Sequence, residues 1–313
     1  MIEVEGLTQR YGAYVAVRDL SFALDAGEVV GFLGPNGAGK STTLKVVSAF
    51  LAPSEGRVAV GGHDVLRAPL AVREVLGYLP EHCPLYDEML VRDHLGFVAR
   101  VRGLTPAERG AAVGRAVERC GLGEVLSRPV RALSKGFRQR VGIALAILHD
   151  PAVVVLDEPT SGLDPLQVRE VRALVRELGR ERTVLFSSHV LSEVEATVGR
   201  VVVIHRGRRV ADGPLAELQR RVTGGAVECA FAGAEAGLAE GLGGLEGVSA
   251  VEPGAVVCAA DAAAFRVRPQ DGVVDLPARL SAFAAQRGHV LVHLAPARAT
   301  LEEVFLELTG APS

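Results

Sequence analysis

The stretch Gly34-Pro-Asn-Gly-Ala-Gly-Lys40-Ser41 constrains this chain most, because it matches the pattern G-x-x-x-x-G-K-[ST] at every fixed position. The apolar run from Val29 to Leu33 predicts a buried strand before it, and Leu44, Val46 and Val47 predict a helix after it. In such a strand–loop–helix unit, glycines let backbone N–H groups surround phosphate oxygens, and the helix N-terminus favours negative charge. The residues expected to bind a nucleoside triphosphate here are Gly34, Pro35, Asn36, Gly37, Ala38, Gly39, Lys40, Ser41 and Thr42.

Two side chains of this loop carry the expected chemistry. Lys40 would place a positive charge near the outer phosphates, and Ser41 would offer a hydroxyl to Mg²⁺. A glycine-rich turn without a ligand is the alternative interpretation. Four matching positions and the correct flanks disfavour that alternative.

Length and composition exclude several classes of protein. The 313 residues suffice for about two domains. The net charge of −3 argues against a general nucleic-acid binder. The four cysteines form no C-x-x-C pair, which disfavours a zinc or redox site. The N-terminus does not resemble a secretory signal, and no apolar run has the length of a membrane span, so we expect a cytoplasmic protein.

The pattern of apolar residues divides the chain into regions. Residues 1–85 are predicted to be strand-rich, residues 86–150 mainly helical, and residues 151–215 strands alternating with helices. We place a domain boundary near residue 220. The fold class expected for residues 1–220 is α/β, with the site at the carboxyl ends of parallel strands.

The remainder, residues 221–313, is rich in Ala and Gly, and we interpret it as a small α+β domain. Its expected strands are Val227 to Phe231, Ala255 to Ala259 and Val290 to Leu294. Leu276, Leu280, Phe283 and Ala284 share one face of a predicted helix, and Thr300 with Glu303 predicts a capping box at the start of a second helix.

A second motif follows the apolar strand Val153 to Leu156, where Asp157 and Glu158 come in succession. Asp157 would hold Mg²⁺ opposite Ser41, and Glu158 would polarise the water that attacks the γ-phosphate. The motif lies about 120 residues after the phosphate-binding loop, in the order that a Mg²⁺–nucleotide site requires.

A third motif, Leu133-Ser-Lys-Gly-Phe137, precedes a helix that Ser134 would cap. This segment resembles the LSGGQ signature of ATP-binding cassette (ABC) ATPases. The order of motifs over residues 1–220 is similar to that family, including Ser161-Gly-Leu-Asp164 as the D-loop and His189 as the switch histidine. The resemblance implies a P-loop cassette with a mainly parallel central sheet, an antiparallel β subdomain and a helical subdomain over about residues 86–150.

The resemblance also implies roles for individual residues. Glu158, His189 and Lys40 would be catalytic, and Tyr11 would stack on adenine. Two cassettes of the family face each other, so Ser134 and Gly136 would contact the ATP bound by the partner. Asp164 would make a contact across the dimer.

Two motifs, the signature and the Q-loop, depart from the family pattern. Lys135 and Phe137 replace glycine and glutamine of the signature, while Ser134 and Gly136 are kept. Glu81 stands where the family has the glutamine of its Q-loop, and its carboxylate still offers oxygen to Mg²⁺. We expect a working but slower site.

Three segments resemble the ATP-binding subunits of ABC-2 type exporters, and the gliding-motility type in particular: Leu79 to Tyr86, Leu133 to Val141, and Thr300 to Thr309. Such subunits work as homodimers or heterodimers with a separately encoded transmembrane permease, on the cytoplasmic face of the membrane. The segment Cys83 to Leu95 could form the groove that receives a short helix of that permease. The end of the chain is similar to an accessory domain of these proteins.

Two other functions stay open from the sequence. One is a soluble ABC ATPase that acts on nucleic acid or ribosomes, and the single cassette and the acidic tail disfavour it. The other is a regulatory protein with little turnover. The altered signature favours this alternative, whereas the intact Asp157, Glu158 and His189 disfavour it.

Overall fold

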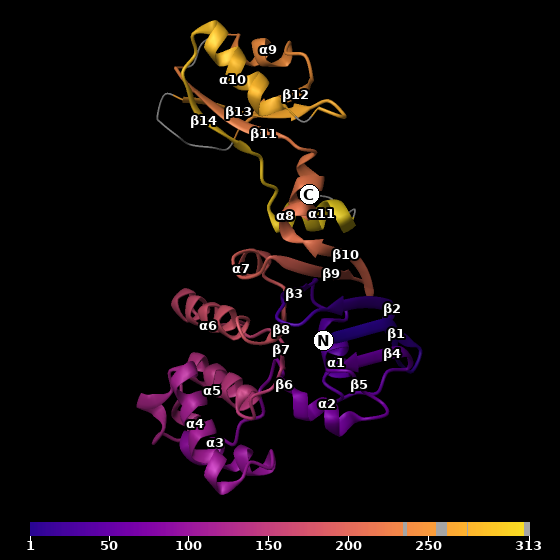
Figure 1. Ribbon diagram of the computed structural model, residues 1–313, viewed down its shortest axis with the longest axis vertical. Helices are drawn as coiled ribbons and strands as arrows, with labels where there is room; N and C mark the ends of the chain where they lie inside the picture. The colour runs from indigo at the N-terminus through magenta and orange to yellow at the C-terminus, as the bar shows by residue number, and fades with distance from the viewer. Residues whose placement is uncertain (234–236, 255–261, 274, 310–313) are drawn as a thin grey trace. The chain divides into compact units, whose positions relative to one another are not determined.

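The computed structural model describes residues 1–233, 237–254, 262–273 and 275–309 (Figure 1). The chain divides into two compact units, Met1–Leu215 and Ala216–Ser313. The boundary predicted after residue 220 falls inside helix α8, Leu215–Thr223.

A six-stranded sheet forms the centre of the first unit, in the order β10-β9-β3-β8-β7-β6. The strands β9, β3, β8, β7 and β6 are parallel neighbours, and β10 pairs with β9 in the antiparallel sense. Their bounds are β3 Val29–Leu33, β6 Leu76–Leu79, β7 Val153–Leu156, β8 Thr183–Ser188, β9 Arg200–His205 and β10 Arg208–Pro214. The predicted parallel strands are confirmed, and β7 and β8 are buried throughout, as continuous apolar runs of central parallel strands should be.

A second, antiparallel sheet has the order β2-β1-β4-β5. Its strands are β1 Ile2–Tyr11, β2 Tyr14–Leu24, β4 Glu55–Val60 and β5 His63–Asp64. Side chains from both sheets share one hydrophobic core around α1. Within it, the rings of Phe22 and Phe32 have centroids 5.4 Å apart. The central sheet and the antiparallel β subdomain that the sequence predicted are therefore both present.

Helices cover the sheet and form a separate group near β6. The helices of this unit are α1 Lys40–Val47, α2 Pro69–Val75, α3 Val91–Val101, α4 Pro106–Cys120, α5 Lys135–Ile147, α6 Pro165–Leu178 and α7 Leu191–Glu195, with 3₁₀ turns at Gly123–Val125 and Val130–Ala132. Figure 1 shows α3, α4 and α5 gathered together beyond β6, where α5 contacts that strand. This group is the predicted helical subdomain.

The second unit contains a four-stranded antiparallel sheet of order β12-β13-β11-β14. Its elements are β11 Val227–Ala232, α9 Leu238–Gly243, β12 Val248–Pro253, β13 Ala262–Pro269, α10 Leu276–Arg287, β14 Leu291–Pro296 and α11 Leu301–Thr309. The order β-α-β-β-α-β with this strand arrangement is the split β-α-β fold. The strand expected over 255–259 lies outside the described residues.

Burial in the second unit follows the predicted pattern. Leu276, Leu280, Phe283 and Ala284 of α10 are all buried against Cys229 and neighbouring residues of the sheet. The predicted capping box also forms, because the Thr300 backbone N–H donates to Glu303 Oε2 at 2.7 Å and the Glu303 N–H donates to Thr300 Oγ1 at 3.2 Å.

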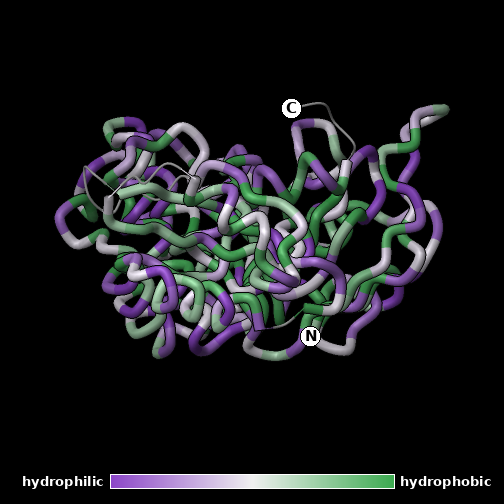
Figure 2. The backbone as a smooth tube through the Cα atoms, turned by 90° about the horizontal axis from the view of Figure 1, so that it is seen from above, coloured by the Kyte–Doolittle hydropathy of each residue, from purple (hydrophilic) through white to green (hydrophobic). Residues whose placement is uncertain are grey.

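Hydrophobic and hydrophilic stretches alternate along the backbone (Figure 2). Among the described residues, no helix combines the length and the apolar character needed to cross a bilayer.

Candidate functional site

The site residues follow the carboxyl ends of four neighbouring strands. Gly34 comes after β3, His189 after β8, Asp157 after β7, and Glu81 after β6. Parallel strands end at the same edge of a sheet, so residues far apart in the sequence converge there.

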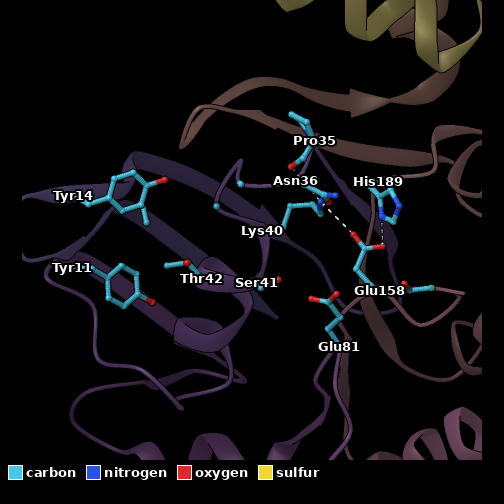
Figure 3. A pocket seen from close by; sticks show the side chains of 14 residues that line it. Tyr11, Tyr14, Pro35, Asn36, Lys40, Ser41, Thr42, Glu81, Glu158 and His189 are labelled. Carbon is cyan, nitrogen blue, oxygen red and sulfur yellow. Dashed lines mark hydrogen bonds and ion pairs between the residues drawn. The ribbon is translucent and has the colours of Figure 1, made fainter.

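A cavity of about 630 Å³ opens at this edge. In Figure 3, Tyr11 and Tyr14 lie on one side of it, and Glu158 and His189 lie on the other. The cavity is large enough for a nucleotide, with a ring-lined end and a charged end. Its lining residues are Tyr11, Tyr14, Ala16, Pro35, Asn36, Gly37, Gly39, Lys40, Ser41, Thr42, Glu81, Glu158, Ser161 and His189.

The conformation of the loop explains its glycines. Gly39 has φ of 103°, and a Cβ on it would lie 2.7 Å from the carbonyl oxygen of Ala16. A Cβ on Gly34 would overlap the carbonyl oxygen of Ile204. Any other residue type at these two positions would therefore push the loop away from β2 or β9.

Lys40 is buried, and carbonyl and carboxylate oxygens surround its ammonium. Its Nζ donates to the carbonyl oxygen of Gly34 at 2.7 Å and lies 3.2 Å from Oε1 of Glu158. Only 6% of each of these two side chains is exposed, so solvent screens the pair weakly. The lysine charge is thus held at the mouth of the loop, opposite the acid that follows β7.

Glu158 occupies a strained backbone position, and its carboxylate contacts Lys40 and His189. Its φ is 49°, which is uncommon for a residue with a side chain, and its backbone N–H donates to Ser187 Oγ at 2.9 Å. Besides Lys40, its carboxylate contacts Nδ1 of His189, which lies 2.8 Å from Oε2 (Figure 3). Such outliers concentrate at functional sites because the surrounding structure must hold them in place.

Asp157 lies deeper, and its surroundings call for a cation. It is 1% exposed, and Ser187 Oγ donates to its Oδ1 at 2.6 Å. Burial raises the pKa of Asp157, and the nearby charges of Glu81 and Glu158 raise it further, while hydrogen bonds from Ser187 and Ser41 oppose that rise. A hard divalent cation bound here would offset the free-energy cost of burying the ionised Asp157 carboxylate.

The donor set at this position is chemically right for Mg²⁺ but incomplete by itself. Ser41 hydrogen-bonds Asp157, and Glu81 lies on the same cavity wall. Among the described residues there is no group of three His, Cys, Asp or Glu side chains that could hold a metal alone. Mg²⁺ usually takes one or two protein oxygens and completes its shell with phosphates and water, and these residues fit that need.

Several predicted residues lie outside the cavity wall. Gly34 and Ala38 shape the loop without lining the cavity, and Asp157 lies beneath it. Ser134, Gly136 and Asp164 are not brought to the cavity: Ser134 caps α5, and Asp164 caps α6 by accepting from the backbone N–H groups of Leu166 and Gln167.

Two lining residues were missed from the sequence, namely Tyr14 and Ala16, and Ser161 was expected only as part of the D-loop. Tyr14 pairs with Tyr11 across the β1–β2 turn. The sequence signal for it was a second aromatic residue three positions after Tyr11, in a chain with 4% aromatic residues.

A groove separate from this cavity runs between β6 and α3, with a volume of about 550 Å³. We call it the β6–α3 groove. Phe50, Tyr86, Phe97 and Val101 supply apolar walls. Lys45, Arg73 and Arg102 add positive charge, and the predicted segment Cys83 to Leu95 contributes Cys83, Pro84, Tyr86 and His94.

Comparison with known proteins identifies the family of the chain. Residues 17–161 match the family described as ABC transporter. The chain is 40% identical over 205 residues to the ABC transporter ATP-binding protein NatA of Bacillus subtilis, covering 65% of this chain and 83% of that protein. It is 35% identical over 311 residues to the daunorubicin resistance ATP-binding protein DrrA3 of Streptomyces coeruleorubidus, covering 99% of this chain and 96% of that one.

A solved structure titled as the ATP-binding subunit of an ABC transporter is similar with a TM-score of 0.64 and 33% identity. The similarity covers 71% of this chain and 92% of that one. The α/β fold class is thereby confirmed, whereas the gliding-motility subgroup stays a prediction.

Proposed function

The chain belongs to the ABC transporter family as an ATP-binding subunit, and we propose that it hydrolyses ATP with Mg²⁺ to drive the membrane subunit of an exporter. The observation that carries this proposal is the buried pair of Lys40 and Glu158 beside the phosphate-binding loop, with the exposed ring of His189 in contact with the Glu158 carboxylate. A protein that only bound nucleotide would not need a buried carboxylate held between Lys40 and His189.

The cluster supports a specific exchange of partners. Lys40 has Glu158 as its ionic partner, and a γ-phosphate would offer it a stronger one. Once Lys40 turns to phosphate, the carboxylate of Glu158 is free to accept a proton from water. His189 then keeps that carboxylate oriented through its Nδ1 contact.

Mg²⁺ would be held by Ser41 and Asp157, with Glu81 as a further oxygen donor, and would neutralise charge on the phosphates. Tyr11, together with Tyr14, would contact the adenine ring, since both lie at the end of the cavity away from Glu158 (Figure 3).

Two copies would complete each site. Ser134, Gly136 and Asp164 lie outside the cavity of their own chain, as is expected of residues that act on the partner's nucleotide. The N-terminus of α5, capped by Ser134, would point at the γ-phosphate across the dimer.

We assign residues 1–220 to the nucleotide-binding domain and residues 221–313 to an accessory domain. The similarity to DrrA3 runs through both regions, which supports a shared role for the second one. DrrA3 is named as a daunorubicin resistance protein. By analogy, we infer that the substrate class of the exporter served by this chain is a small molecule.

The β6–α3 groove would receive a helix of the membrane subunit, which would keep the chain on the cytoplasmic face of the membrane. The groove exposes the large apolar side chains of Phe50, Tyr86 and Val101. A docked helix would remove this apolar surface from water.

Affinity purification from detergent-solubilised native membranes, with ATP and Mg²⁺, tests the exporter assignment. We expect a stoichiometric subunit with several membrane spans, and its loss when Val101→Glu places a charge on the groove wall. Recovery of the chain with ribosomes, or alone, in the soluble fraction would contradict the assignment.

A further inference from the structure

The first turns of α5 and α6 pack against each other inside one chain. A Cβ on Gly136 would lie 2.6 Å from Cδ of Gln167, and a Cβ on Gly162 would overlap the ammonium of Lys135. One turn further along both helices, Arg140 and Glu170 form an ion pair. The signature segment therefore lies against the D-loop at Gly162 and against α6 at Gln167, and the Arg140–Glu170 ion pair ties it to α6 further along.

Lys135 is unusual within this contact. It is exposed in the first turn of α5, where a cation opposes the helix dipole and where no acidic residue offsets it. Among the residues that the structure describes, its ammonium has no hydrogen bond or ion pair, and it lies against Gly162, in the space that a Cβ on that residue would fill. A lysine at this position destabilises the start of α5. Any favourable contribution that it makes must therefore come from its contact with Gly162.

The D-loop connects that contact to Glu158. The Ser161 N–H donates to the carbonyl oxygen of Glu158 at 3.1 Å, and the Leu163 N–H donates to that of Thr160 at 3.2 Å. Asp164 closes the segment by capping α6. These two hydrogen-bonded turns thus connect Gly162 to Glu158, whose strained backbone sets the direction of its own carboxylate.

We propose that Lys135 is a positioning residue that holds the D-loop of its own chain and thereby orients Glu158. This inference rests on the proposed function. Since the signature segment would contact the ATP of the partner, Lys135 would also link closure at one nucleotide to hydrolysis at the other. It acts through Gly162 and not by direct contact with the nucleotide of its own site.

The first test needs no nucleotide, so it is independent of the proposed function. Amide hydrogen exchange of the full chain is compared for the wild type, Lys135→Met, Lys135→Arg and the control Lys45→Met, which removes an exposed lysine from α1. We expect Lys135→Met to raise exchange in the D-loop peptide containing Ser161 and Leu163 several-fold. Lys135→Arg should restore protection, and Lys45→Met should leave it unchanged. Unchanged exchange in Lys135→Met would overturn the proposal.

The second test separates an effect on the same chain from an effect across the dimer. Mixed dimers of two differently tagged copies keep one working site, because one copy carries Glu158→Gln. When Lys135→Met is placed on the copy that retains Glu158, we expect kcat to fall roughly tenfold with KM for ATP unchanged. When it is placed on the Glu158→Gln copy, kcat should match that of the dimer without it.

Three other results of the second test contradict the proposal. A loss confined to the second arrangement would mean that Lys135 acts on the partner's phosphates. Equal losses in both arrangements would indicate a general structural effect, and no loss in either would remove the role. If Lys135→Met raises exchange in the D-loop but the wild-type chain has no turnover, the proposed function is contradicted. The contact of Lys135 with Gly162 would then still be established.

Discussion

At the scale of single residues, the site is organised by charges that burial makes strong. Lys40 and Glu158 are each 6% exposed and 3.2 Å apart, so removal of one leaves the other charged and poorly solvated. Phosphate would be the better partner for Lys40, and the pair with Glu158 holds the ammonium in place for it.

Lys40→Met tests the loop. We expect ATP affinity to fall by about a hundredfold, because a charge-assisted contact to phosphate is lost in a weakly screened site. Titration with a fluorescent ATP analogue measures the affinity, with Lys45→Met on the exposed side of the same helix as the control. Affinity within twofold of the wild type would contradict the assignment of Lys40.

Asp157→Asn tests the magnesium assignment. The pKa of Asp157 is raised by burial, so its ionised form destabilises the fold above that pKa, and this cost disappears as the pH falls through it. The neutral amide should therefore raise the melting temperature of the nucleotide-free chain at pH 7. It should also abolish the further stabilisation that Mg²⁺ adds to ATP. Thermal melts with ATP, with and without Mg²⁺, check both effects, and a Mg²⁺ increment equal to that of the wild type would contradict the role.

Residue identities at the site were largely predictable from the sequence, but their geometry was not. The loop pattern and the Asp157-Glu158 pair specify which groups converge, because both motifs follow strands that are predicted to be parallel, and β8 alone separates these strands in the sheet. The left-handed backbone of Glu158 and the contribution of Tyr14 depend on tertiary packing, which no local pattern encodes.

At the scale of elements, α5 connects the signature to β6 through a histidine. His149, just beyond the end of α5, shares a hydrogen bond of 3.2 Å between Nε2 and the carbonyl oxygen of Leu76, while its Nδ1 is buried and has no partner in the part of the chain that the structure describes. Burial, and secondarily the charge of Arg102, lowers its pKa from 6.5 to about 4. The folded chain thus holds this ring neutral.

His149→Gln tests this contact through pH. Because the folded pKa is below the unfolded value, the unfolded state takes up the proton first, and the wild type loses stability as the pH falls from 6.5 toward 4. Glutamine can keep the hydrogen bond to Leu76 without titrating. The loss of stability of His149→Gln over this pH range should therefore be smaller than that of the wild type by about 2 kcal/mol. Urea unfolding at several pH values measures the difference, and parallel curves for the two proteins would contradict it.

Elements of the first unit were more predictable than those of the second. The strand β7 is a continuous apolar run and β8 is apolar from Val184 to Phe186, and their short length together with their β-branched residues identifies them as strands. In the second unit, β13 begins with the alanines 262–264, which have weak strand propensity, and cross-strand pairing with β11 decides their conformation. The strand β13 was missed for that reason, and β12 was not predicted either.

At the scale of the whole molecule, the two units have separate cores. Leu280 is fully buried among Phe231, Phe283 and other residues of the second unit, whereas the nucleotide cavity belongs wholly to the first. Leu280→Ala should destabilise the second unit by about 2–5 kcal/mol. KM for ATP should stay within twofold. Calorimetry and steady-state kinetics check these outcomes, and a large rise in KM would show that the second unit shapes the site.

Turnover with Glu158→Gln tests the central claim most directly. Phosphate release is measured for the purified wild-type chain and for this variant, with Mg²⁺ and ATP, alongside the dimer fraction in size-exclusion chromatography. We predict that the variant binds ATP as tightly as the wild type, accumulates as a long-lived dimer and releases phosphate about 10²–10⁴-fold more slowly, because the acceptor for the water proton is lost. Unchanged turnover in Glu158→Gln would contradict the catalytic account of this site.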